Sequence, residues 1–228
     1  MTAAHRGFFI TGTDTGVGKT LVACAFLKVY AGRGLRAIGM KPVAAGARQE
    51  NGRLVNDDVD ALKAASSVTA GEDLVNPYCF SPPVAPHIAA AEAGIAIELD
   101  RIRSAYRALA AAADRVIVEG AGGFRVPLGP RLDTAQLAAA LGLPVVLVVG
   151  MRLGCLNHAL LTAEAVRASG LTLAGWIANH IDPAMSRAAE TVAALEGRLA
   201  APLIARIEHS EKPDASRVAA ALRADVLQ

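Results

Sequence analysis

A glycine-rich segment near the start of the chain carries the strongest chemical signal. The apolar stretch FFITG leads directly into GTDTGVGKT, residues 12–20, and an apolar helical pattern follows. Backbone N–H groups of such a loop, together with the positive end of the next helix, favour phosphate. We expect Lys19 to reach the β- and γ-phosphates of a nucleotide and the Thr20 hydroxyl to hold Mg²⁺. Strand, loop and helix come in the order that this chemistry needs, so a chance Gly-Lys-Thr is the weaker interpretation, although Gly12 makes the loop one residue longer than usual.

Acidic residues that could hold the metal lie in two other places. Glu119 ends the apolar stretch RVIVE and precedes a glycine-rich turn. The carboxyl edge of a parallel sheet is where α/β proteins bind ligands, and Mg²⁺ prefers oxygen ligands. Asp57, Asp58 and Asp60 form a second cluster at a predicted helix start. Since Asp is also a favoured capping residue, spacing alone does not choose among these three.

A second lysine, Lys41, follows an apolar stretch and precedes a proline. Its position predicts a cation at the same edge of the sheet as Glu119. A lone lysine at a strand end is usually solvated, so its position alone does not assign it to a site.

Strands and helices that alternate along the chain must position these groups. Short apolar strands between alanine-rich helices indicate βαβ units around a parallel sheet. The predicted strands are Gly7–Thr11, Arg36–Lys41, Arg115–Glu119, Val145–Val149, Leu173–Ala178 and Pro202–Ile207. The predicted helices are Thr20–Ala31, Asp57–Ala65, Glu98–Ala113, Thr134–Leu141, Asn157–Ser169, Met185–Leu199 and Asp214–Val226. We expect an α/β fold of P-loop type, with a mainly parallel sheet flanked by helices on both faces, as a single domain over residues 1–228.

Two long segments, Val43–Asn56 and Asn76–Gly94, show no clear periodicity and are predicted to be loops. Long loops in α/β proteins tend to carry function.

Composition narrows the classes of partner. The 228 residues include 23 basic and 21 acidic residues, a net charge of +2, which is too balanced for a dedicated nucleic-acid binder. The longest apolar run, Leu141–Met151, is about half of the roughly 20 residues that a membrane helix needs. Cys24, Cys79 and Cys155 lie far apart and favour a reducing compartment. We expect a cytoplasmic protein with a small-molecule partner and no nucleic-acid or membrane partner.

The ordered set of motifs resembles the dethiobiotin synthetase family. The matching segments are TGTDTGVGKT, GMKPVAAG, the stretch of residues 56–59, PYCFSPPVAPHIAAAEAG, VEGAGGFRVPL, LGCLNHALLTAEAVRASGL and GWIANHIDP. The resemblance implies a Mg²⁺-dependent ligase of biotin biosynthesis that carboxylates and cyclises 7,8-diaminononanoate with CO₂ and ATP. The product would be dethiobiotin, formed through a carbamate and a carbamic-phosphoric anhydride with release of ADP and phosphate. It also implies a cytoplasmic homodimer.

The resemblance assigns roles to particular residues. Catalytic roles fall on Lys41, Lys19 and Thr15, and Mg²⁺ would lie among Thr20, Asp58 and Glu119. ATP-binding roles fall on Gly16, Val17, Gly18, Lys19, Thr20, Leu21, Asp58, Glu119, Gly120, Ala121, Gly122, Asn179, His180, Ile207, Glu208 and His209, with Asn179 as the amide that recognises adenine. Substrate-binding roles fall on Lys41, Ala45, Gly154, Cys155, Leu156 and Asn157, the last four reaching across a dimer interface.

Some of these residues have simpler interpretations or depart from the family pattern. Asn157 could be an ordinary helix N-cap, and Cys155 a small packing residue. Ala45 stands where family members often have Ser or Thr, and Glu208 stands where Ile-Pro is common. His87, in the proline-rich segment, is left out of the catalysis.

Three other functions use similar features. A partitioning or septum-site ATPase shares the fold but usually has a lysine near the start of its P-loop, and no lysine lies between Met1 and Gly18. A synthetase that amidates a cobalamin precursor usually carries a glutamine-hydrolysing domain, for which 228 residues leave no room. A simple nucleotide-binding module would not need a second cation such as Lys41 beside the phosphates.

Overall fold

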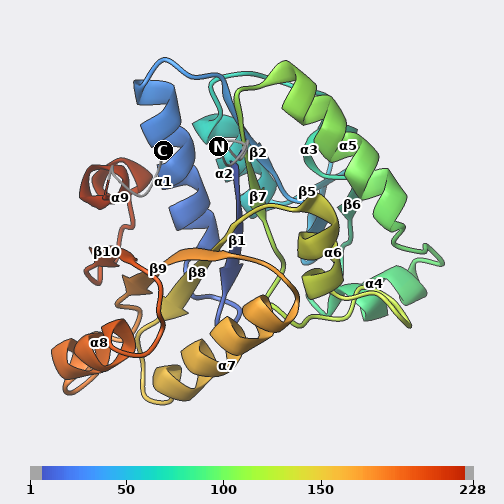
Figure 1. Cartoon of the computed structure of the whole chain (residues 1–228). Coiled ribbons are helices and arrows are strands. Elements are labelled where there is room, and N and C mark those ends of the chain that lie inside the picture. Colours follow the sequence, from blue (N-terminus) through green and yellow to red (C-terminus); the bar gives the residue numbers. More distant parts are fainter. Residues whose placement is uncertain (1–6, 224–228) are drawn as a thin grey trace.

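Six parallel strands form the central sheet of the computed structural model, which describes residues 7–223 (Figure 1). The strand order is β10-β9-β8-β1-β7-β2, and every pairing is parallel. The strands are β1 Gly7–Gly12, β2 Ala37–Met40, β7 Arg115–Glu119, β8 Val145–Gly150, β9 Leu173–Asn179 and β10 Leu203–Ile207. Each overlaps a predicted strand, so the predicted parallel α/β architecture is confirmed.

Helices cover both faces of the sheet. One face packs against α1 (Lys19–Gly32), α2 (Asp57–Ala65) and α9 (Ala215–Ala221). The other packs against α5 (Leu99–Ala112), α6 (Thr134–Leu141), α7 (Cys155–Ala168) and α8 (Ala188–Glu196). Successive side chains of a strand point to opposite faces, so each buried strand contributes side chains to two separate hydrophobic cores, one on each side of the sheet.

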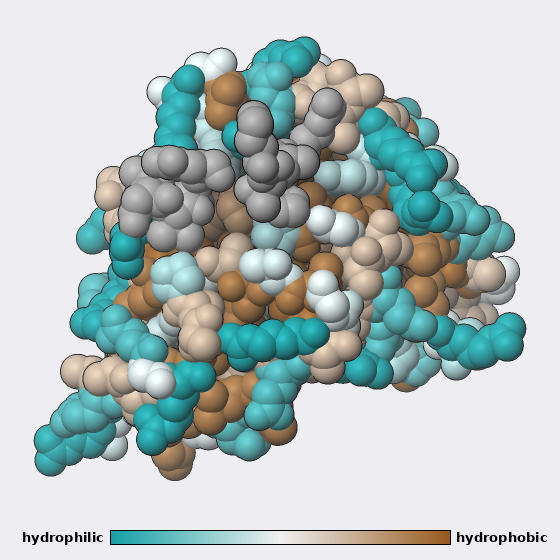
Figure 2. Space-filling model, in the orientation of Figure 1, coloured by the Kyte–Doolittle hydropathy of each residue, from teal (hydrophilic) through white to brown (hydrophobic). Residues whose placement is uncertain are grey.

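The outer helices separate apolar from hydrophilic faces. On α5, Ile102, Ala105 and Leu109 are buried against the sheet. Its solvent side carries residues such as Asp100 and Arg107, and hydrophilic side chains follow this helix on the right of the view in Figure 2. Within residues 7–223, none of the helices has the length and apolarity needed to cross a bilayer.

The two segments predicted to be loops contain short elements. In the first, β4 (Arg48–Glu50) and β5 (Arg53–Val55) form a hairpin. The hairpin turns at Asn51-Gly52, where both residues adopt the positive φ that a tight turn of this kind requires. Also in this segment is β3 (Val43–Ala44); it pairs with β6 (Tyr78–Cys79) of the second segment, which also contains α4 (Pro86–Glu92). A four-residue helix, α3 (Glu72–Val75), precedes β6.

Two helices differ from the prediction by three or more residues at an end. Helix α8 spans Ala188–Glu196 and not the predicted Met185–Leu199; it starts later because residues 182–187 form turns and Arg187 has a φ of 57°. The final helix ends at Ala221, where Leu222 takes an extended conformation; the predicted continuation reaches residues 224–226, which lie outside the described residues.

The parallel sheet places six strand ends at one edge. The residues there are Gly12, Glu119, Gly150, Asn179 and Ile207, with Lys41 directly after β2. This edge is the one from which parallel α/β sheets present ligand-binding groups.

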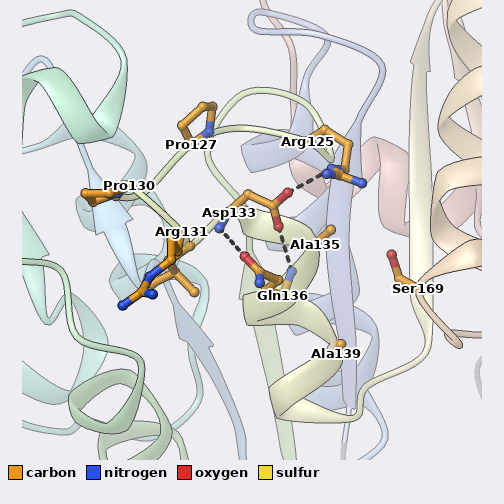
Figure 3. Close-up of a pocket in the computed structure, with 11 residues that line it drawn as sticks. Arg125, Pro127, Pro130, Arg131, Asp133, Ala135, Gln136, Ala139 and Ser169 are labelled. Atoms are coloured by element: carbon orange, nitrogen blue, oxygen red, sulfur yellow. Dashed lines mark hydrogen bonds and ion pairs between the residues drawn. The ribbon is translucent and has the colours of Figure 1, made fainter.

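A capping box starts α6 at a surface cleft of about 600 Å³ (Figure 3). Asp133 accepts a hydrogen bond from the Gln136 backbone N–H (2.8 Å), and the Gln136 side chain accepts one from the Asp133 N–H (2.9 Å). Arg125 Nε lies 2.8 Å from the same carboxylate. The box satisfies two helix-end donors that would otherwise lack partners.

We predict that Asp133→Ala lowers the free energy of unfolding by about 1 kcal/mol, because a helix start loses its cap. For a chain of this size the melting temperature falls by about 2–4 °C, measured by thermal unfolding with circular dichroism. Asp133→Asn is the matched control, since its amide oxygen still caps the helix. Equal melting temperatures for the Ala and Asn variants would contradict the capping role.

Candidate active site

The phosphate-binding loop connects β1 to α1. Gly16 and Gly18 adopt φ values of 74° and 90°, and Gly18 is the N-cap residue of α1. The Val17 side chain is buried, and Lys19, only 6% exposed, donates from Nζ to the Asp14 carbonyl at 2.9 Å. The loop is therefore a compact turn with the Lys19 ammonium folded against its own backbone.

A buried cluster of opposite charges lies beside this loop. Lys41 Nζ lies 2.5 Å from Glu119 Oε1 and 2.7 Å from Asp58 Oδ2. The Thr20 hydroxyl oxygen lies 2.8 Å from Asp58 Oδ1 and 2.9 Å from Glu119 Oε1. Lys41 is 4% exposed and Glu119 1%. Four side chains that are far apart in the sequence thus share one small volume.

Local structure selects Asp58 from the acidic cluster. The N-cap of α2 is Asn56, whose side chain accepts from the Asp58 and Val59 N–H groups and donates to the Ala45 carbonyl. Asp57 instead forms an ion pair with Arg48, and Asp60 is exposed. Because the Asn56 amide caps α2, the Asp58 carboxylate is not needed as a cap and faces Thr20 and Lys41.

Burial and neighbouring charges shift the pKa values of the cluster. Burial lowers the pKa of Lys19 to about 8, and the positive charge of Lys41 acts in the same direction. Burial would also lower the pKa of Lys41, but the Glu119 and Asp58 carboxylates outweigh it and hold that pKa above its ordinary value. For Asp58, the Lys41 ammonium overcomes burial and lowers the pKa. For Glu119, burial prevails and the pKa is raised.

A cleft of about 770 Å³ opens over this cluster. It is lined by the predicted residues Thr15, Gly16, Gly18, Lys19, Thr20, Lys41, Ala45, Asp58, Glu119, Ala121 and Gly122. Sequence reasoning missed Asp14, Pro83 and Val84, which also line the cleft. The proline-rich segment could have pointed to Pro83 and Val84, and the position of Asp14 inside the glycine-rich loop was a weaker indication for that residue. The Asp14 carboxylate forms an ion pair with Arg152.

A second cleft, of about 450 Å³, begins on the other side of the loop. Its predicted members are Gly16, Gly18, Leu21, Asn179, His180, Ile207, Glu208 and His209. Residues that the sequence did not single out, among them Arg206 and Arg217, complete it from β10 and α9. Because Gly16 and Gly18 line both clefts, the two meet at the phosphate-binding loop.

Sequence comparisons agree with this geometry. A family model described as an AAA domain matches residues 6–217. The chain is 60% identical to a protein of Aromatoleum aromaticum named ATP-dependent dethiobiotin synthetase BioD, over 96% of this chain and 97% of that one. A protein of Nitrosospira multiformis with the same name is 56% identical over 92% of this chain and 91% of its own length. The chain belongs to the dethiobiotin synthetase family. It is therefore an enzyme of the ligase class, as the resemblance implied.

Solved structures of other P-loop ATPases share the family's fold. A ParA family ATPase from Chlorobium tepidum superposes with a TM-score of 0.56 at 16% identity, over 91% of this chain and 86% of that one. The MinD cell division protein of Aquifex aeolicus gives 0.52 at 15% identity, over 91% and 84%. At such identities the likeness shows the fold alone.

Six residues that the family resemblance assigned to ligands line neither cleft. The helix start assigned to substrate, Gly154 to Asn157, is mostly exposed, although Cys155 is buried. Here Gly154 is the N-cap of α7 and Asn157 lies inside the first turn, so the interpretation of Asn157 as an ordinary N-cap is wrong. The other two lie underneath the loops: Val17 is buried, and the Gly120 N–H donates to the Ile10 carbonyl.

The donor set in the main cleft fits a magnesium ion. Thr20, Asp58 and Glu119 supply hard oxygen atoms, and Glu119 Oε2 is buried without a hydrogen-bond partner. This donor set contains only two carboxylates, and among residues 7–223 there is no cluster of three or more His, Cys, Asp or Glu side chains that could hold a metal ion by itself. Phosphate oxygens and water would complete the coordination of an ion at this cleft, which is usual for Mg²⁺.

We predict that triphosphate binding is accompanied by proton uptake above pH 8. With a pKa of about 8, Lys19 is mostly neutral at pH 8.5, and a nearby triphosphate favours the ammonium form and raises that pKa. Uptake of up to about 0.75 proton per site at pH 8.5, falling to about 0.1 at pH 7, follows from these populations. Titration calorimetry in buffers of different ionisation enthalpy measures it. Equal proton uptake at both pH values would contradict the lowered pKa.

Proposed function

We propose that this chain joins 7,8-diaminononanoate and CO₂ into the cyclic urea dethiobiotin at the expense of ATP. The main support is that the family match extends over nearly the whole chain, while the side chains that line one cleft include Lys19, Lys41, Asp58 and Glu119. The names of the relatives supply the product and the nucleotide.

The reaction has three steps. One amine of the substrate attacks the carbon of CO₂ and loses a proton, which forms a carbamate. A carbamate oxygen then attacks the γ-phosphorus of ATP, and the bond to the β–γ bridging oxygen breaks to release ADP. Finally the second amine attacks the carbamate carbon of the mixed anhydride, loses its proton and expels phosphate, which closes the ring.

Lys19 and Lys41 would offset the repulsion in the second step, in which two anions, the carbamate and the triphosphate, are brought together. Lys41 is held as a cation by its carboxylate partners, and Lys19 lies close enough to Lys41 that their repulsion adds to burial in lowering the Lys19 pKa. Preorganised charges of this kind are the main contribution of a protein to phosphoryl transfer. We assign Lys19 to the phosphates and Lys41 to the transferred group and carbamate, with Thr15 beside them at the cleft.

Mg²⁺ would be held by Thr20, Asp58 and Glu119, and it would neutralise phosphate charge when bound. Lys41 contacts both of these carboxylates in the ligand-free structure. The carboxylates that would hold the ion are therefore the same ones that hold the Lys41 ammonium in place.

The second cleft is assigned to the nucleoside of ATP. It adjoins the phosphate loop and is lined by the polar residues Asn179, His180, Glu208 and His209.

Ala45, in the main cleft, offers no hydroxyl, so we propose that the diamine is held there without the contact that Ser or Thr would provide.

The start of α7 is assigned to a partner subunit. Gly154 to Asn157 line neither cleft of their own chain, and Leu153 next to them is 96% exposed. In a homodimer these residues would reach the substrate site of the partner, as the family resemblance implies.

An assay with components omitted one at a time tests the function. We expect ADP release from purified protein, Mg-ATP, bicarbonate and 7,8-diaminononanoate to require the diamine and CO₂ together, with a product of dethiobiotin mass in mass spectrometry. ADP release that does not depend on the diamine would overturn the proposal and indicate a regulatory ATPase.

We predict that Lys41→Ala lowers kcat by at least about a hundredfold, because the variant loses a charge positioned for the transition state. The Kd for Mg-ATP stays within about threefold, since Lys19 and the loop still hold the phosphates. Steady-state kinetics and calorimetry measure the two quantities. Lys28→Ala is the control, as Lys28 is exposed on α1 and lines neither cleft. A parallel loss of turnover and ATP affinity would rule out the assigned role of Lys41.

A further inference from the structure

The Asn179 side chain contacts the phosphate-binding loop directly. Its Nδ2 donates to the Val17 carbonyl at 2.8 Å. A Cβ atom on Gly18 would lie 2.3 Å from the same nitrogen, so the amide packs against the backbone of the loop with no room for a side chain. Two residues 162 positions apart are thereby joined at the turn that opens α1.

Asn179 is well placed to hold the loop because its own position is constrained. It is the last residue of β9, pairs with Gly150 of β8 and Ile207 of β10, and is 7% exposed. Its carbonyl accepts from the Met151 N–H at 2.7 Å. The side chain therefore projects from a rigid part of the sheet.

The hydrogen bond that fixes the Val17 carbonyl also fixes the direction of the Gly18 N–H, which belongs to the same peptide group. In a trans peptide the C=O and N–H groups point in opposite directions. With the Val17 carbonyl directed at Asn179, the Gly18 N–H points away from that side chain. Gly18 lines both clefts, and as a glycine it adopts its φ of 90° without strain but is equally free to adopt others, so a contact from outside the loop helps to select this conformation.

We propose that Asn179 is a positioning residue that holds the phosphate-binding loop in the conformation that binds phosphate, in addition to any contact with the base. The inference rests on the proposed nucleotide site. One Nδ2 hydrogen serves Val17, which leaves Oδ1 and the other hydrogen for a base in the second cleft. The same side chain would link occupation of the base cleft to the geometry of the phosphate loop.

A ligand that lacks a base separates the two roles. We would measure the Kd of Mg-tripolyphosphate and of Mg-ATP by titration calorimetry for wild type, Asn179→Ala, Asn179→Asp and His180→Ala. We expect both Asn179 variants to bind tripolyphosphate about tenfold more weakly, equivalent to about 1.4 kcal/mol. His180→Ala, which alters only the base cleft, keeps tripolyphosphate affinity within about twofold.

Two Asn179 variants and a stability measurement distinguish a specific effect on the loop from a loss of the folded structure. Asn179→Asp keeps the side-chain volume, replaces the donor opposite the Val17 carbonyl by an acceptor and adds a negative charge, so the loss of affinity must also appear in the uncharged Asn179→Ala variant; thermal unfolding without ligand checks both proteins. Unchanged tripolyphosphate affinity in Asn179→Ala, with weaker ATP binding, would assign Asn179 to the base alone and overturn the inference. The measurement uses no diamine, so failure of dethiobiotin formation would leave its result intact. Failure of wild type to bind tripolyphosphate would overturn the inference.

Discussion

The buried Lys41 ammonium and its two carboxylates are the interaction on which the site depends. A charge as well buried as Lys41 or Glu119 is costly unless it is paired and hydrogen-bonded. Lys41 meets that condition through Glu119 and Asp58, and Glu119 meets it through Lys41 and the Thr20 hydroxyl. The pair therefore requires β2 and β7 to lie side by side in register, because Lys41 follows one strand and Glu119 ends the other. Asp58 adds a third charge from α2, whose orientation is set by the Asn56 cap.

The same sheet edge also explains how one fold serves different functions. The ParA and MinD structures share the fold at about 15% identity, while relatives at 56–60% identity carry the dethiobiotin synthetase name. A parallel sheet flanked by helices brings strand ends and a helix start to one place whatever residues stand there. In this chain, the residues at that edge include a second cation, Lys41 after β2, and the proline-rich segment lines the cleft beside it.

The loop between β1 and α1 is supported from both sides. On one side Lys19 folds back onto the Asp14 carbonyl, and Asp14 is tied to Arg152 after β8. On the other side Asn179 holds the Val17 carbonyl from the end of β9. Glycines with positive φ let the chain make this turn, but contacts from distant strands select the one conformation that is seen.

Much of the molecule followed from local patterns in the sequence. Apolar strands buried on both faces, alanine-rich helices and the glycine-rich loop with its Lys-Thr depend on neighbours in the chain, so the six strands and helices α2 and α6 were predicted with close boundaries. Short elements such as the β3–β6 pair were not predicted, because two residues in each strand are too few to show an apolar pattern and only their pairing defines them. The motifs in their order were also enough to indicate the family.

Other features were decided by the tertiary structure alone. Spacing left Asp57, Asp58 and Asp60 equivalent and the family resemblance implied Asp58, but it is the packing of α2 that turns Asp58 toward Lys41 and Thr20. The sequence suggested a role for Asn179 toward the base, but its hydrogen bond to Val17 depends on strand order. Composition and spacing determine which residues are available and which elements they form. Which charges share a buried volume is determined by contacts between elements remote in the chain, because a charge is stabilised by what surrounds it in space.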